Sequence, residues 1–85
     1  MLKADRLNRG RFAIVRKVEG KGVLKKRLYE IGCTPGTGIV LLHKAPFGDP
    51  LLFIVRDSRV VMRRSEAATI LAEYDQKQRI SRILW

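Results

Sequence analysis

Two short apolar runs, each ended by prolines or glycines, constrain the fold of this chain most. The runs are GIVLLHK (38–44) and LLFIVR (51–56), and APFGDP (45–50) separates them. Apolar runs of this length fit strands or helices, and the prolines and glycines at their ends favour strands. Pro46 and Pro50 have no N–H group for a strand ladder, so one strand ends and the next begins within this segment.

Turn-forming residues mark the other connections. Gly48 permits a positive φ, and Asp49 is suited to an Asx turn between the two apolar runs. Pro35 and Gly36 stand at the second and third positions of TPGT, as a type II turn favours. The dipeptide DS (57–58) lies between LLFIVR and RVVMRR and predicts a tight hairpin connection.

One short helix is predicted after the first strand. RFAIVRKVEG (11–20) is rich in β-branched and apolar residues and predicts that strand. Across KGVLKKRLYEIG (21–32) the period changes, and an apolar stripe at helical spacing comprises Val23, Leu24, Leu28 and Ile31. Lys25 and Lys26 point away from this stripe, and Gly32 lies where a helix C′ glycine is expected.

The C-terminal part of the chain is predicted to form a helical turn, a last strand and a tail. In SEAATIL (65–71), Ser65 is suited to a helix N-cap and Glu66 to the first turn, which predicts one helical turn. TILAEY (69–74) predicts a final strand, and the polar tail 75–85 carries apolar residues at helical spacing, namely Ile80, Ile83 and Leu84.

These elements together predict a mainly β fold with a short helix. The expected order is strand, helix, three strands, a short helical turn and a last strand, followed by a C-terminal tail. Short strands joined by tight turns in 85 residues are typical of one small, partly open antiparallel barrel. Charged residues are available to protect the open edges of such a barrel: Arg56, Arg59, Arg63 and Arg64.

The charge of the chain is high and uneven. The net charge is +10, and residues 1–30 hold ten basic and three acidic side chains. An excess of this kind indicates an acidic partner, such as a nucleic acid, an anionic membrane surface or an acidic protein face. A solvated surface that keeps the protein soluble explains the same excess, and composition alone leaves both interpretations open.

A cytoplasmic protein is expected. The one cysteine, Cys33, has no partner for an internal disulfide, as is typical of a reducing compartment. Residues 1–11 are charged and lack the apolar segment of a signal peptide. The apolar runs are far shorter than the roughly 20 residues that span a bilayer.

The order of these motifs resembles that of the FeoA family. LxxIGxxPG closes the helix and opens the next strand, and APFGDP and VMRRSEA follow at the family's spacing. The matching residues extend over 7–74 and are Leu7, Gly10, Ile14, Gly20, Leu28, Ile31, Gly32, Pro35, Gly36, Ile39, Ala45, Pro46, Gly48, Asp49, Pro50, Val55, Val61, Arg63, Ala67 and Ile70. The chain departs from the family at Cys33, in its Lys/Arg-rich helix and in the tail 75–85.

The resemblance implies an SH3-like barrel over residues 1–74, with 75–85 as a tail. It also implies a non-enzymatic accessory of bacterial ferrous iron uptake. Such a protein is expected to bind the cytoplasmic, GTPase-containing part of the FeoB transporter. It would then meet the inner face of the membrane only indirectly, through the transporter.

Two groups of residues are candidates for contact with such a partner. A basic cluster on the helix and its entry comprises Lys21, Lys25, Lys26 and Arg27. Phe47 and Asp49 occupy the predicted turn, where an exposed aromatic side chain is suited to anchor a partner. Each group has a structural alternative, because the cluster fits a solvated helix face and Phe47 can fold back over the barrel mouth. The glycines and prolines of both turns are expected to be structural: Gly32, Pro35, Gly36, Pro46, Gly48 and Pro50.

No cofactor, metal site or catalytic set is expected. The possible metal ligands lack a recognised spacing and comprise Glu30, Cys33, His43, Asp49 and Asp57. No GxxxxGK[ST] motif for nucleotide phosphates occurs, and one histidine in a predicted strand suggests no nucleophile–base pair.

Two alternatives stay open. An SH3-like barrel with this charge could bind RNA, although the scattered aromatic residues form no base-stacking face. The tail 75–85 could dock on its own barrel, join two protomers into a homo-oligomer, or rest on a membrane surface.

Overall fold

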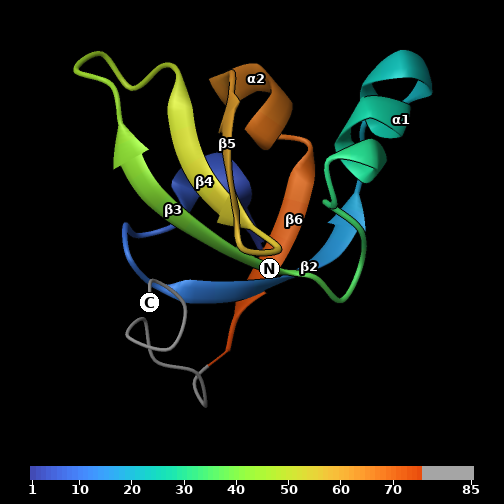
Figure 1. Cartoon of the computed structure of the whole chain (residues 1–85), viewed down its shortest axis with the longest axis horizontal. Coiled ribbons are helices and arrows are strands. Elements are labelled where there is room, and N and C mark those ends of the chain that lie inside the picture. Colours follow the sequence, from blue (N-terminus) through green and yellow to red (C-terminus); the bar gives the residue numbers. More distant parts are fainter. Residues whose placement is uncertain (76–85) are drawn as a thin grey trace.

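The polypeptide folds into one six-stranded antiparallel sheet that curls around an apolar core (Figure 1). A computed structural model describes residues 1–75. The strand order is β1-β6-β2-β3-β4-β5, with antiparallel neighbours throughout. The elements in chain order are β1 Leu2–Lys3, the 3-10 helix η1 Ala4–Arg6, β2 Phe12–Val18, α1 Gly22–Glu30, β3 Gly38–Lys44, β4 Leu51–Val55, β5 Ser58–Met62, α2 Arg64–Ala67 and β6 Ile70–Tyr74. The predicted mainly β fold with a short helix is confirmed.

Side-chain alternation in the strands builds the core. Along β4, Leu51, Phe53 and Val55 are buried, and the residues between them are half-buried. In β3 the consecutive residues 39–41 are all buried, which explains why this run is apolar without alternation. Leu28 of α1 joins the same cluster, so the helix is attached to the barrel through one fully buried side chain.

The N-terminal segment was not predicted to have regular structure. Residues Leu2 and Lys3 pair with Ala72 and Leu71 of β6, and η1 follows directly. Ala4 and Leu7 are buried in the core. A two-residue strand is too short to show a hydrophobic period, so its pairing depends on the rest of the barrel.

The hairpin between β4 and β5 differs by one residue from the prediction. Its two loop residues are Arg56 and Asp57, whose φ angles are 51° and 66°, and Val55 pairs with Ser58. Positive φ at both loop positions is the geometry of a type I′ turn, whose twist suits a two-residue hairpin. Arg56 therefore belongs to the turn and not to the strand, and Ser58 belongs to β5.

The short helix α2 begins earlier than predicted. Its N-cap is Arg63 and not Ser65. The Glu66 carboxylate explains the shift, because its Oε1 accepts the backbone N–H of Arg63 at 2.8 Å. That bond satisfies a backbone N–H at the start of the helix. The Ser65 side chain was expected to fill this capping role.

The two predicted turns around α1 are present. Gly32 follows the helix with a φ of 102°, which favours glycine. Gly36 has a φ of 94°, and Thr37 N–H donates to the Thr34 carbonyl at 3.0 Å across the TPGT turn. No helix within residues 1–75 is long and apolar enough to cross a membrane. The predicted helical spacing of Ile80, Ile83 and Leu84, and with it the proposed homo-oligomer, falls outside the described residues.

Candidate partner-binding site

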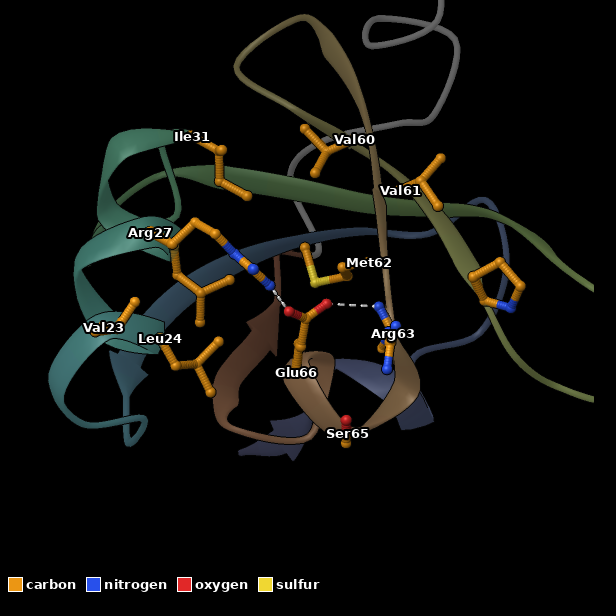
Figure 2. Close-up of a pocket in the computed structure, with 12 residues that line it drawn as sticks. Val23, Leu24, Arg27, Ile31, Val60, Val61, Met62, Arg63, Ser65 and Glu66 are labelled. Atoms are coloured by element: carbon orange, nitrogen blue, oxygen red, sulfur yellow. Dashed lines mark hydrogen bonds and ion pairs between the residues drawn. The ribbon is translucent and has the colours of Figure 1, made fainter.

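An open groove of about 840 Å³ runs between α1 on one side and β5 and α2 on the other (Figure 2). Its walls are mostly aliphatic, and charged groups lie where α1 faces α2. The lining residues are Val23, Leu24, Arg27, Leu28 and Ile31 of the α1 region, Val60, Val61 and Met62 of β5, and Pro50, Arg63, Ser65 and Glu66. We refer to this feature as the α1–β5 groove.

The apolar stripe predicted on α1 forms one wall of the groove, with one exception. Leu28 is buried, and Leu24 and Ile31 are half-buried against the core. Val23 is 82% exposed, so this member of the predicted stripe lines the groove without packing against the core. It lies in the first turn of the helix, on the rim of the groove and away from the core.

An ion pair crosses the groove between the two helices. The Arg27 guanidinium reaches from α1 to Oε2 of Glu66 on α2, while Oε1 of Glu66 holds the N–H of Arg63 (Figure 2). The Glu66 side chain is only 15% exposed and that of Arg27 is 60% exposed. The pair therefore links α1 to α2 and leaves one face of the guanidinium open to solvent or to a partner.

The connection between β3 and β4 is held in place by hydrogen bonds. Gly48 N–H donates to the Ala45 carbonyl at 2.7 Å, and Arg64 N–H donates to Oδ1 of Asp49 at 3.0 Å. The carboxylate thus bonds to α2 and does not form the predicted Asx turn. The peptide bond between Asp49 and Pro50 is cis. A loop held by these two hydrogen bonds presents its tip with little further loss of conformational freedom on binding.

Phe47 lies at the tip of that loop and is 96% exposed. The alternative that it folds back over the barrel mouth is wrong in this structure. Pro50, at the other end of the same loop, lines the α1–β5 groove. The loop therefore joins an exposed aromatic side chain to one end of the groove.

The structure divides the predicted basic cluster. Of its four members only Arg27 lines the groove. Lys25 and Lys26 are exposed elsewhere on α1, and Lys21 is exposed at its N-cap. The Lys25 ammonium lies 5.6 Å from the centroid of the Tyr29 ring. Contact of these lysines with a partner stays a prediction.

The exposure of Val61 on β5, between Arg59 and Arg63 on the same face, was missed at the sequence level. Val61 is 66% exposed and its neighbours Val60 and Met62 are partly or fully buried. Neighbouring residues of a strand point to opposite faces, so one valine of the VV pair had to face outward. That alternation was the available signal.

The possible metal ligands do not come together. Cys33 is fully buried, and desolvation raises the pKa of its thiol from an ordinary 9.0 to about 11, which opposes the thiolate that metals bind. His43 is exposed on β3. Within residues 1–75 no three His, Cys, Asp or Glu side chains are grouped as a metal site would need.

Comparisons with known proteins point to one family. The FeoA domain family matches residues 3–74. A Porphyromonas gingivalis protein described as an Fe(2+) transport protein A/Fe(2+) transporter FeoB fusion is 36% identical over 72 residues. That match covers 85% of this chain but only 8% of the fusion protein.

Solved structures agree in fold. Iron(II) transport protein A from Clostridium thermocellum superimposes with a TM-score of 0.83 at 32% identity, over 86% of this chain and 45% of that chain. FeoA of Stenotrophomonas maltophilia, described as a prokaryotic SH3 domain protein complexed with zinc, gives 0.76 at 27% identity, over 86% of this chain and 91% of that one. The present chain, with its curled six-stranded sheet and short helix, belongs to the FeoA family and has its SH3-like fold.

Proposed function

We propose that this protein is an accessory of ferrous iron transport that binds the cytoplasmic, GTPase-containing part of a FeoB-type transporter. The observation that carries the proposal is the Porphyromonas gingivalis relative, in which an Fe(2+) transport protein A is fused to a FeoB transporter. A covalent link keeps two domains at high mutual concentration, which favours even weak contact between them. Association that does not depend on such a link requires a binding surface.

The α1–β5 groove and the Phe47 loop supply the features of such a surface. A mostly aliphatic groove with a few charged groups, and an exposed aromatic side chain on a loop that contributes Pro50 to the groove, are typical features of a recognition site. The net charge of +10 favours a partner with an acidic face. In this proposal the GTPase chemistry belongs to the transporter, and the accessory changes it only by binding some of its states more tightly than others.

An NMR titration of the labelled protein with the soluble cytoplasmic domain of the transporter from the same organism tests the proposal. We expect shifts in α1, β5 and the 45–50 loop, larger with a non-hydrolysable GTP analogue than with GDP or the reverse. Saturable binding in either nucleotide state supports the proposal, and its absence in both contradicts it. Generic RNA serves as the control, because tight RNA binding without transporter binding would favour the alternative function.

A matched pair of charge reversals tests the basic cluster. In the Lys25→Glu/Lys26→Glu variant we expect weaker binding, because both side chains lie on the exposed face of α1. The control is Lys3→Glu/Lys17→Glu, whose residues flank Leu71 on the outer face of the sheet. Both variants lower the net charge equally, so only a local contact separates their affinities. Equal affinities would remove these lysines from the binding surface.

A further inference from the structure

The strand β5 has a free edge. Within residues 1–75 it ends the sheet order and pairs only with β4. In a two-residue hairpin the residues that flank the loop, here Val55 and Ser58, form a hydrogen-bonded pair, and the pairs then alternate along the strand. The backbone groups of Val60 and Met62 therefore face β4, whereas those of Arg59 and Val61 face away from it.

One donor on this edge is satisfied and two are not. The N–H of Arg63 continues the same alternation and is accepted by Glu66. Among residues 1–75, the backbone groups of Arg59 and Val61 take part in no hydrogen bond. An edge with free N–H and C=O groups is a template for another strand, unless a charge, a proline or a covering element blocks it. The charge on this edge is that of Arg59, which repels a basic strand and attracts an acidic one.

The α1–β5 groove runs along this edge. Val60, Val61, Met62 and Arg63 are consecutive, and all four line it. Successive side chains of a strand point to opposite faces, so a hollow on one face would meet only alternate residues. Figure 2 shows Val60 and Met62 directed toward α1 and Val61 on the opposite side of the strand. Because the groove is lined by side chains from both faces of β5, it lies beside this strand, in the position where a further strand would pair.

We propose that an extended segment of the partner adds to the sheet along the free edge of β5. Its backbone exchanges hydrogen bonds with Arg59 and Val61, as in other cases of strand addition. An aliphatic side chain of the segment enters the groove between Ile31 and Val60, and an acidic side chain on the outer face pairs with Arg59. The inference rests on the proposed function in one respect, because the segment is assigned to the cytoplasmic part of the transporter.

Charge favours an acidic segment of the partner over two other candidates for the edge of β5, namely residues 76–85 and a second copy of the chain. Residues 76–85 of the chain contain Lys77, Arg79 and Arg82 and no acidic residue, so they do not complement an edge that carries Arg59. A second copy of the chain would bring two proteins of charge +10 together. An acidic-aliphatic segment meets both the charge and the unpaired backbone groups.

Amide hydrogen exchange of the full chain, alone and with the transporter's cytoplasmic domain, tests the pairing directly. We expect the amides of Arg59 and Val61 to exchange rapidly in the free protein and to be protected at least about tenfold in the complex. The amides of Val60 and Met62 already bond to β4 and serve as internal controls. Protection of Arg59 and Val61 without the partner, and dependent on concentration, would assign the edge to a second copy and overturn the proposal.

A pair of substitutions at residue 61 separates the backbone from the side chain. Val61→Pro removes an edge N–H that β4 does not use, and Val61→Thr keeps it with a similar shape. We expect the proline variant to bind the transporter domain at least about tenfold more weakly, and the threonine variant within about threefold of the original chain. The NMR spectrum of each variant verifies that the fold is retained, and the exchange experiment needs no variant.

The outcomes distinguish the two proposals. If the original chain binds the transporter domain but Arg59 and Val61 stay unprotected and Val61→Pro binds as well as Val61→Thr, strand addition is wrong and the accessory function stands. If the original chain does not bind that domain at all, the proposed function fails, and the assignment of the segment fails with it.

Discussion

Gly38 is required at its position by a neighbouring side chain and not by its backbone angles. It opens β3 opposite Ile14, and a Cβ atom at this position would lie 2.5 Å from Cε2 of the Phe12 ring. Contact that close forces the ring out of its place. We expect Gly38→Ala to lower the free energy of unfolding by about 1–3 kcal/mol, as overpacking does, measured by urea denaturation.

A double-mutant cycle isolates that contact. In a Phe12→Val background the ring is gone, so Gly38→Ala should have little effect or stabilise the strand slightly. An equal loss of stability in both backgrounds would show that the ring is not the cause.

Cys33 makes stability depend on pH at the alkaline end. Burial raises the pKa of this thiol to about 11, whereas the unfolded chain has the ordinary 9.0. Between these values the unfolded state loses the proton and the folded state keeps it, so stability falls as pH rises above about 9, by at most about 1.4 kcal/mol per pH unit. Urea denaturation between pH 8 and about 10.5 measures the slope. For the Cys33→Ala variant, the fall of the unfolding free energy with pH should be less steep by that amount. Identical slopes for the two proteins would contradict the assignment to Cys33.

A substitution of Phe47 is expected to weaken binding while leaving stability nearly unchanged. Its side chain is 96% exposed, so Phe47→Ala should change the free energy of unfolding by less than about 0.5 kcal/mol. As an aromatic anchor it should nevertheless account for at least about a tenfold change in affinity for the transporter domain, measured by calorimetry. Leu2→Ala, on an exposed apolar residue of β1, is the control that should bind normally. An unaltered Phe47→Ala complex removes the anchor from the proposal.

At the scale of elements, the link between α1 and α2 depends on the two roles of Glu66. The ion pair with Arg27 is partly exposed, so Arg27→Met and Glu66→Gln should each cost about 0–1 kcal/mol of unfolding free energy. Glu66→Ala also removes the acceptor of the Arg63 N–H and should cost about 1 kcal/mol more than Glu66→Gln. Thermal or urea denaturation of the three variants measures the order of their stability losses. Equal losses for Gln and Ala would mean that the bond to Arg63 contributes nothing.

Elements with a side-chain period were predictable, and those fixed by distant pairing were not. The elements β4, β6 and α1 carry a burial period in consecutive residues, and β3 was recognisable as a continuous apolar run bounded by glycine and proline. The two residues of β1 carry no such pattern, and their position depends on the edge of β6 that β2 leaves free. The start of α2 moved to Arg63 because Glu66 satisfies its N–H, a side-chain choice that an N-cap preference for Ser65 does not encode.

The candidate site was predictable only in its parts. Phe47 was recognisable as a turn residue and Arg27 as a member of a basic helix. The groove that Arg27 lines forms because the sheet ends at β5 while α1 packs beside it, which brings together residues about 40 positions apart in the sequence. Local patterns predict which face of an element is apolar. They do not predict which apolar face is left without a neighbour.

At the scale of the whole molecule, the charge is the feature that a partner meets first. All eight acidic residues lie within residues 1–75, where ion pairs join Asp5 to Arg64, Glu66 to Arg27 and Glu73 to Arg16. These pairs neutralise acidic groups locally and leave the excess of basic side chains on the surface. The net charge of +10 is therefore not compensated by these pairs, and an excess of positive charge steers an acidic partner toward the protein before any contact forms.

Steering by charge predicts a specific kinetic result. Stopped-flow measurement of binding to the transporter domain should show an association rate that falls steeply as the salt concentration rises from about 0.05 to 0.5 M, since the Debye length shortens. The dissociation rate should change little, because the groove and the edge of β5 hold the complex through short-range contacts. The Lys3→Glu/Lys17→Glu variant should lower the association rate alone. Lys25→Glu/Lys26→Glu should also raise the dissociation rate, because it changes a contact as well as the field. A salt-independent association rate would mean that the charge of this protein does not guide it to its partner.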